Sequence, residues 1–142
     1  MKAHLVLGYF VASLALFSVP AHSEKCDTQN EMNKCAANSY EKADAELNKV
    51  YAQVLKEYEQ NDIELAAEQK RLGISFDFAR PSLIKAQKAW ITFRDATCTL
   101  ENVNGQGGSM HGMEFSGCLR RLTLKRIDEL KGKTSCDGGS IE

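Results

Sequence analysis

The first long pattern in the chain repeats apolar residues in steps of three or four positions. Such spacing places side chains on one face of a helix, and the members are Ala36, Tyr40, Ala43, Leu47, Val50, Val54 and Tyr58. Thr28 precedes this run and is followed three residues later by Glu31, which is the form of a capping box. The pattern therefore predicts a helix from Thr28 to Tyr58, about 45 Å long at the helical rise.

The apolar pattern is interrupted at residues 60–62. Residues 63–72 then either continue the first helix or form a short second one, and Gly73 is the expected C-terminal stop. Residues 74–78 are apolar and short, and we expect an ordered connection there. Pro81 suits the first turn of another helix, because the N–H that it lacks would have no partner at that position.

Two more helices are predicted beyond Pro81. One covers residues 82–98, and the other covers residues 119–130 and ends at Gly132. The inward stripe of the first consists of Leu83, Ala86, Trp90, Phe93 and Thr97. Residues 101–117 hold five glycines and predict a long loop. No segment has the period of two that strands require, so the predicted fold is all-α, a small antiparallel bundle or hairpin of three to four helices. The expected core anchors are Leu47, Tyr51, Trp90, Phe93 and Leu122.

The N-terminus has the pattern of a secretory signal peptide over residues 1–23. Lys2 supplies the positive start, residues 5–19 are mostly apolar, and Ala21-His22-Ser23 is a small-x-small cleavage site. Its removal would leave one helical domain, residues 24–142, with 133–142 as a flexible tail. No later segment approaches the roughly 20 apolar residues of a membrane span, and no lipobox precedes Cys26. We expect a periplasmic or secreted, soluble protein.

Five cysteines beyond the cleavage site fit export to an oxidising compartment. Antiparallel packing of the last two helices would bring Cys98 near Cys118, so this pair is expected to staple the Gly-rich loop. Cys26–Cys35 follows by elimination, although the exchange that pairs Cys35 with Cys98 and Cys26 with Cys118 is geometrically open. Cys136 lies beyond the last helix and is the expected free thiol.

Few residues suit catalysis. His111 is the one histidine after residue 23, and it stands where a G-x-S-x-G nucleophile elbow needs its second glycine, two positions after Ser109. No C-x-x-C pair or cluster of histidines and carboxylates suits a metal. We therefore expect no enzymatic activity, no metal and no cofactor. A net charge of -1, or -2 without residues 1–23, argues against a nucleic-acid partner.

Several segments resemble the LprI-type lysozyme inhibitor family. The most specific is Gln87-x-x-Trp90-x-x-x-Arg94-Asp95-x-x-Cys98. The likeness covers nearly all of the predicted mature chain. The other motifs are Cys26 with Glu31-Met32-Asn33-Lys34-Cys35-Ala36, Leu47-Asn48-x-x-Tyr51, Gly107-Gly108-Ser109 and Cys118-Leu119-x-x-Leu122-Thr123-x-x-Arg126-x-x-x-Leu130. The resemblance implies a small exported protein with lysozyme as its partner. The chain departs from the family in two ways, because some members carry a lipobox and because Cys136 stands outside the four-cysteine pattern.

A lysozyme holds its glycan in a cleft with two carboxylates. An inhibitor needs an element that projects into such a cleft and is rigid enough to limit the entropy cost of binding. The loop from Asn102 to Ser116 is the candidate, with Gly107, Gly108, Ser109 and His111 as contacts, unless it only connects two helices. Arg94-Asp95 is expected to be an ion pair or a cap for that loop. The alternative function is a periplasmic accessory or immunity-type factor with a partner other than lysozyme.

Overall fold

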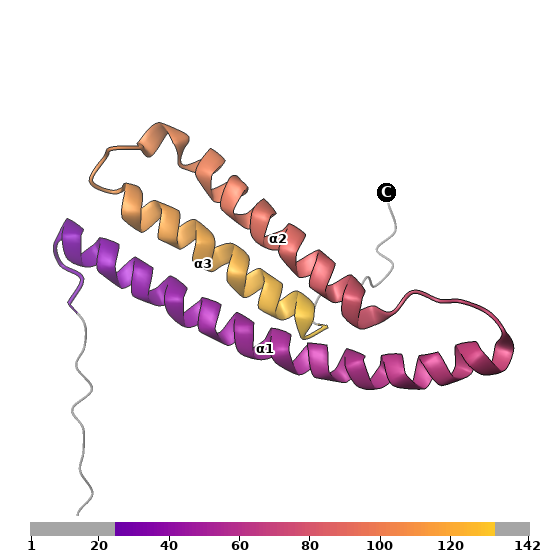
Figure 1. Ribbon diagram of the computed structural model, residues 1–142. Helices are drawn as coiled ribbons and strands as arrows, with labels where there is room; N and C mark the ends of the chain where they lie inside the picture. The colour runs from indigo at the N-terminus through magenta and orange to yellow at the C-terminus, as the bar shows by residue number, and fades with distance from the viewer. Residues whose placement is uncertain (1–24, 133–142) are drawn as a thin grey trace, which may run out of the picture.

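The structure is a computed structural model that describes residues 25–132. In that part of the chain it has three α-helices and no strand: α1 (Gln29–Leu72), α2 (Ala79–Glu101) and α3 (His111–Leu130), with the short 3₁₀ helix η1 (Val103–Gly105) after α2 (Figure 1). The all-α prediction is therefore confirmed. The predicted signal peptide, the predicted tail and Cys136 lie outside the described residues.

Local signals at both ends define α1. The Thr28 hydroxyl accepts a hydrogen bond from the Glu31 N–H at 3.3 Å, and the Glu31 carboxylate accepts one from the Thr28 N–H at 2.9 Å, which completes the predicted capping box. The backbone N–H and the hydroxyl of Thr28 hold the pKa of Glu31 below its ordinary value. Gly73 ends the helix in the left-handed conformation at a φ of 69°.

Between these ends α1 is a single helix of 44 residues, about 66 Å long at the helical rise. It is longer than the predicted span of 28–58, and residues 63–72 continue it instead of forming a second helix. The polar residues 60–62 include no glycine or proline, so their cost in helix propensity is below about 1 kcal/mol each.

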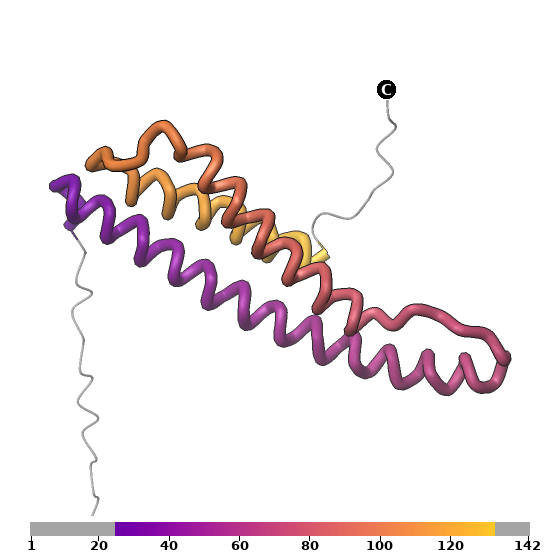
Figure 2. Tube along the Cα trace, turned by 45° about the horizontal axis from the view of Figure 1, so that its top comes forward, coloured from indigo at the N-terminus to yellow at the C-terminus, as the bar shows by residue number. Residues whose placement is uncertain are grey.

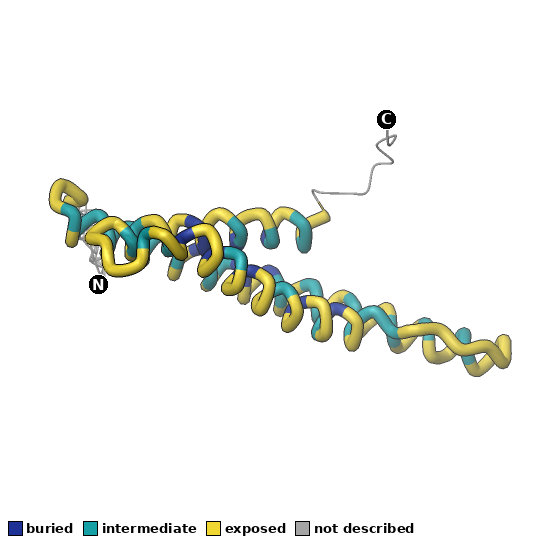
Figure 3. The backbone as a smooth tube through the Cα atoms, turned by 90° about the horizontal axis from the view of Figure 1, so that it is seen from above, coloured by how far each residue is buried: buried dark blue, intermediate teal, exposed yellow. Residues whose placement is uncertain are grey.

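The helices alternate in direction. α3 packs along the N-terminal half of α1 in the most extensive helix–helix contact, and α2 lies against both (Figures 1 and 2). Because α1 has 44 residues and α3 has 20, the C-terminal part of α1 and its connection to α2 extend beyond the end of α3. Figure 3 shows that this extension lacks the buried positions of the main body.

The core consists of two apolar clusters along the line where the helices meet. One is built on Leu47, Val50 and Ile127, against which Val54, Trp90 and Leu130 pack. The other surrounds the Cys98–Cys118 pair and includes Leu119, with Tyr40, Phe115 and Leu122 packed against it. Leu47 is only 2% exposed, whereas the expected anchors Tyr51, Trp90 and Leu122 are half-buried.

The inward face of α2 differs from the predicted stripe. Its buried residues are Leu83, Gln87, Arg94 and Cys98. Ala86 and Phe93 point outward instead, and Phe93 is 59% exposed, so its expected role as a core anchor is wrong. The helix is turned toward Gln87 and Arg94 because both polar side chains find partners inside the bundle, which satisfies their buried hydrogen-bonding groups.

A charged stack around Trp90 joins the three helices. The Arg94 guanidinium lies 5.2 Å from the Trp90 ring centroid and the Arg126 guanidinium of α3 lies 5.8 Å from it, both within cation–π range. Arg94 Nη1 donates to Asp44 of α1 at 3.2 Å, and Arg94 Nε donates to Asp95 at 2.9 Å. The expected Arg94–Asp95 ion pair is therefore present in the structure. Burial lowers the pKa of Arg94, but the hydrogen bond to Asp95 and the neighbouring charges outweigh it, so that the pKa lies above its ordinary value.

The second half of the predicted loop is helical. α3 begins at His111, so the connection is Asn102–Met110, not residues 101–117. Gly112 and Gly117 lie within the first two turns of α3. A Cβ atom on Gly112 would lie 3.4 Å from the Asn33 side chain, so this glycine allows α3 to approach α1 closely. Backbone hydrogen bonds and tertiary packing thus override the low helix propensity of two glycines.

Candidate functional site

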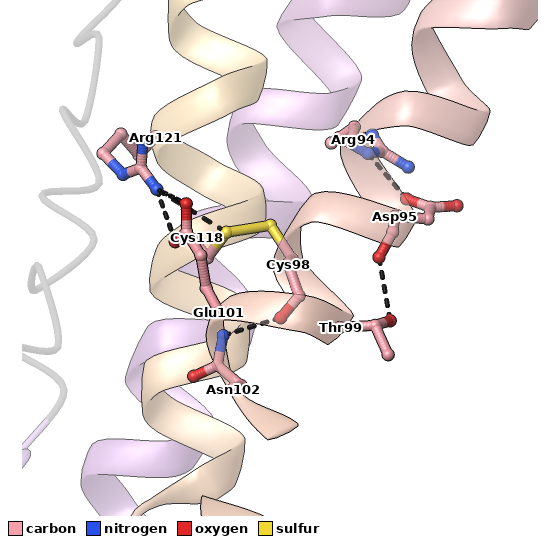
Figure 4. The surroundings of a disulfide bond; sticks show 8 residues. All are labelled: Arg94, Asp95, Cys98, Thr99, Glu101, Asn102, Cys118 and Arg121. Carbon is pink, nitrogen blue, oxygen red and sulfur yellow. Dashed lines mark hydrogen bonds and ion pairs between the residues drawn. A yellow bond between two sulfur atoms is a disulfide. The ribbon is translucent and has the colours of Figure 1, made fainter. Parts of the chain in front are cut away.

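The connection between α2 and α3 is fastened at its base by a disulfide. Cys98 and Cys118 are joined with their Cα atoms 5.6 Å apart, and Cys98 is fully buried (Figure 4). Beside this bond, Arg121 Nη2 pairs with Glu101 at 2.7 Å, and the Asn102 side chain donates to the Cys98 carbonyl at 2.8 Å. The end of α2 and the start of α3 are therefore held together by covalent, ionic and hydrogen bonds.

Three successive turns carry the chain across the gap. The N–H groups of Gly105, Gly108 and His111 each donate to the carbonyl three residues earlier, at 3.0–3.2 Å. Gly107 has a φ of 80°, which favours glycine. A Cβ on Gly108 would come within 3.1 Å of the Gly105 carbonyl oxygen. These two glycines therefore have a structural reason to be there, whatever else they contact.

Asn33 of α1 fixes the far end of the loop. Its Nδ2 group donates to the Ser109 carbonyl at 3.0 Å, and its Oδ1 atom accepts from the Met113 N–H at 3.0 Å and from Gln29 at 3.1 Å. One amide side chain thus holds the last loop residues and the first turn of α3 against the start of α1. It also satisfies a backbone N–H that the helix itself leaves without a partner.

The N-terminal disulfide lies beside this clamp in sequence. Cys26 and Cys35 are bonded with Cα atoms 6.3 Å apart, so the structure does not have the exchanged pairing that the sequence left open. Cys35 lies in α1 two residues after Asn33. The cross-link therefore ties the segment before α1 to the turn that carries the clamp.

The four predicted contact residues have different environments. Gly107, Gly108 and Ser109 are exposed on the loop surface. His111 is the first residue of α3 and is half-buried, and its ring is stacked on Phe115 with centroids 5.9 Å apart. Its Nδ1 atom is buried and has no hydrogen-bond partner among the described residues. His111 is therefore less available to a partner than the other three.

The outward surface of the loop is polar without being charged. No residue from Asn102 to Met110 is ionisable, and Asn104, Gln106 and Ser109 present amide and hydroxyl groups to solvent. Val103 and Met110 are each about half exposed, at 49% and 48%, and add apolar area. Such a surface can donate and accept hydrogen bonds without the large desolvation cost of a buried charge.

The sequence singled out Cys98 and Cys118 as the staple of the loop, but not the polar side chains that also hold it. The sequence pattern gives no role to Asn33, Asn102 or Arg121, because a single polar residue has no periodicity that reveals its partner. Asn33 belongs to the first motif that carries the family resemblance, and this is the one sequence feature that could have drawn attention to it. Nothing comparable marks Asn102 or Arg121.

A second exposed region lies at the opposite end of the molecule, on the extension of α1. A groove of about 290 Å³ is lined there by Glu59, Asp62, Ile63, Ala66, Phe78, Arg80 and Pro81. Ile63, Leu72, Ile74 and Phe76 are exposed by between 44% and 60% in the same region. The loop and the extension are thus separated surfaces: the loop is polar and fastened, and the extension is apolar and projecting.

Within residues 25–132, no group of three or more histidine, cysteine or carboxylate side chains is arranged to hold a metal. None of the helices in the same range is both long and apolar enough to cross a bilayer.

Two comparisons with known proteins found similar sequences. The family model described as lysozyme inhibitor LprI matches residues 21–130. An uncharacterized protein from Rhizobium meliloti (strain 1021) is 43% identical over 107 residues, which cover 75% of this chain and 74% of that protein. No solved structure matches the chain significantly.

Proposed function

Since this chain belongs to the LprI lysozyme inhibitor family, we propose that it inhibits a lysozyme and that the Asn102–Met110 loop enters the glycan cleft. The observation that carries the proposal is the fastening of this loop at both ends. The Cys98–Cys118 disulfide holds its base and Asn33 holds its far end. A loop that is already ordered loses little conformational entropy when it binds.

The chemistry of the loop suits such a cleft. A lysozyme cleft is lined with groups that hydrogen-bond sugar hydroxyls and contains two carboxylates. The exposed amides of Asn104 and Gln106 and the Ser109 hydroxyl offer matching donors and acceptors. Gly107 and Gly108 have no side chain to keep their backbone away from the cleft floor.

The proposed location is the periplasm or the outside of the cell, in soluble form. The signal-like residues 1–23 and the two disulfides support it, because disulfides persist in oxidising compartments. An exported protein would meet peptidoglycan, and the lysozymes that attack it, in these compartments. We propose no enzymatic activity for the chain itself.

A peptidoglycan clearing assay tests the activity. Oxidised protein that begins at Glu24 is mixed with vertebrate-type and phage-type lysozymes, and the turbidity of a cell-wall suspension is followed. We expect at least one lysozyme type to be inhibited at micromolar concentration. Unchanged clearing for every lysozyme type at micromolar excess would contradict the proposal.

A matched pair of variants tests the loop. Alanine at Asn104, Gln106 and Ser109 together should raise the inhibition constant at least tenfold while helical circular dichroism stays unchanged, since these side chains are exposed and outside the core. The control carries serine at Ile63, Ile74 and Phe76 on the α1 extension. If the control loses inhibition and the loop variant keeps it, the contact lies on the extension instead.

An accessory or immunity-type factor with another protein partner is the second candidate. The same fastened loop would serve it, so the loop alone does not separate the two functions. The clearing assay does, because only an inhibitor changes the rate at which a lysozyme works.

A further inference from the structure

α2 carries a second apolar stripe on a face that no other described helix covers. Its members are Ala86, Ala89, Phe93, Ala96 and Leu100, and Val103 of η1 follows just beyond the end of α2. All six residues are exposed, and the exposed fractions of the large ones are 59% for Phe93, 73% for Leu100 and 49% for Val103. The steps alternate between three and four residues, which is the a/d spacing of a helix that packs along another helix. An exposed helix face normally carries charges instead.

The residues on the outer border of this stripe are suited to burial. Thr92 and Thr99 lie there, and their hydroxyls already donate to the carbonyls of Lys88 and Asp95, at 3.3 and 2.8 Å. Covering these threonines would therefore leave no hydrogen-bonding group unsatisfied. Of the residues beside the stripe, Lys85 carries a charge, and it lies next to the first turn only.

The order of large and small residues identifies the occupant. In an antiparallel pair of helices, a positions face d positions of the partner. If two copies of α2 are paired about a twofold axis near residues 94 and 95, Phe93 faces Ala96 and Leu100 faces Ala89. Every layer then combines one large and one small residue, which is how close-packed interfaces are filled.

We propose that the chain forms an antiparallel homodimer through this stripe of α2. Lys85 of each copy lies at an opposite end of the pair, so no like charges face each other. The predicted tail, residues 133–142, contains one large apolar residue, Ile141, and cannot fill the stripe. The proposed dimer rests on α2 and not on the proposed lysozyme activity, although Val103 of the loop lies beside the stripe.

The interface is small. α2 is about 35 Å long, and one helix pair of that length buries less than the roughly 800 Å² per partner of a standard stable interface. The expected dimer is therefore weak and dissociates at low concentration. Its two Asn102–Met110 loops would point to opposite ends.

Sedimentation velocity on protein that begins at Glu24 and carries Cys136→Ser tests the proposal, because this background removes dimers linked through that thiol. Between about 5 and 500 µM we expect a shift from monomer to dimer. Phe93→Lys should raise the dissociation constant at least tenfold, whereas Ile63→Lys, at a site that is 60% exposed on α1, should not change it. Helical circular dichroism checks that both variants fold.

Two further variants test the orientation. Ala96→Leu adds apolar area but should weaken the dimer, because the longer side chain would collide with Phe93 of the other copy in the antiparallel pair. In a parallel pair position 96 faces itself, and the same change would strengthen association. The exchange of Phe93→Ala with Ala96→Phe in one chain restores a large–small layer and should recover dimerisation.

A monomer at 500 µM, or a dimer that Phe93→Lys leaves intact, would overturn the proposal. A stronger dimer in Ala96→Leu would overturn the antiparallel arrangement. Neither result affects the clearing assay, so failure of the dimer and failure of the inhibitor function are separate outcomes.

Discussion

At the scale of single residues, Thr123 is a buried polar group without a partner. It lies in α3 with no exposed surface, and its Oγ1 atom accepts and donates no hydrogen bond among the described residues. A buried hydroxyl in this state costs about 1–3 kcal/mol of desolvation. An apolar residue of the same shape at position 123 should therefore make the protein more stable than threonine does.

We expect Thr123→Val to raise the free energy of unfolding by about 1 kcal/mol, since valine has nearly the same shape and no hydroxyl. Urea unfolding followed by circular dichroism measures it. Thr123→Ala is the matched control and should lower stability, because it removes the hydroxyl but leaves a cavity. A destabilised valine variant would mean that Oγ1 has a partner, such as a buried water.

Arg94 is the opposite case, a buried charge with several partners. It contacts Asp44 and Asp95 and stacks on Trp90 and Tyr40. Arg94→Lys should lower stability by about 1–2 kcal/mol, because a compact ammonium cannot reach both carboxylates or cover the rings as a planar guanidinium does. Thermal unfolding compares it with Arg120→Lys at an exposed site, which should be within about 0.5 kcal/mol of the wild type.

At the scale of elements, α2 takes its N-terminal cap from another helix. Asp62 of α1 accepts the N–H groups of Ala79 and Arg80 at 2.8 and 2.9 Å. The carboxylate also places a negative charge at the positive end of the α2 dipole. The angle at which the chain enters α2 is thus set by a residue seventeen positions earlier.

Asp62→Ala should destabilise the protein by about 1–2 kcal/mol and increase hydrogen exchange of the first amides of α2, because two N–H groups lose their acceptor. Asp62→Asn keeps one acceptor oxygen, so its loss of stability and its increase in hydrogen exchange should lie between those of the wild type and those of Asp62→Ala. Glu64→Ala, an exposed change two residues further along α1, is the control. Equal exchange rates in all three variants would show that α2 does not depend on this cap.

Comparison of the elements shows which features the sequence could predict. The start of α1 and the stop at Gly73 were predictable because Thr28, Glu31 and Gly73 act on their own backbone, whereas the continuation of one helix across residues 60–62 was left open. The inward face of α2 was not predictable. An apolar pattern places Phe93 in the core ahead of Arg94, whereas in the fold the buried Arg94 guanidinium hydrogen-bonds Asp44 of α1, fifty residues away in the sequence. The start of α3 was missed for a similar reason, since glycine content predicted a loop and the Asn33 contacts favour a helix.

At the scale of the whole molecule, the two disulfides should contribute unequally. Cys98–Cys118 joins residues 20 positions apart and Cys26–Cys35 joins residues 9 apart. Loop-closure entropy gives about 3 kcal/mol for the longer loop and somewhat less for the shorter. The longer one also passes through the core, where Cys98 is fully buried.

Replacing Cys98 and Cys118 by alanine should therefore lower the melting temperature more than replacing Cys26 and Cys35, as calorimetry would measure. If the loop proposal is right, the first variant also loses inhibition under conditions where it is still folded. An equal loss of inhibition in the second variant would place the functional surface near the N-terminus of α1.

The stack around Trp90 gives the molecule a built-in optical probe. Trp90 is the one tryptophan in the chain. Guanidinium groups from α2 and α3 lie near its ring, and it packs against the cluster of Leu47 and Val50 of α1 and Ile127 of α3. Indole emission responds to nearby charge and to water, so its wavelength depends on all three helices being docked. Fluorescence of the unlabelled protein therefore reports separation of any one helix, which helical circular dichroism alone would not detect.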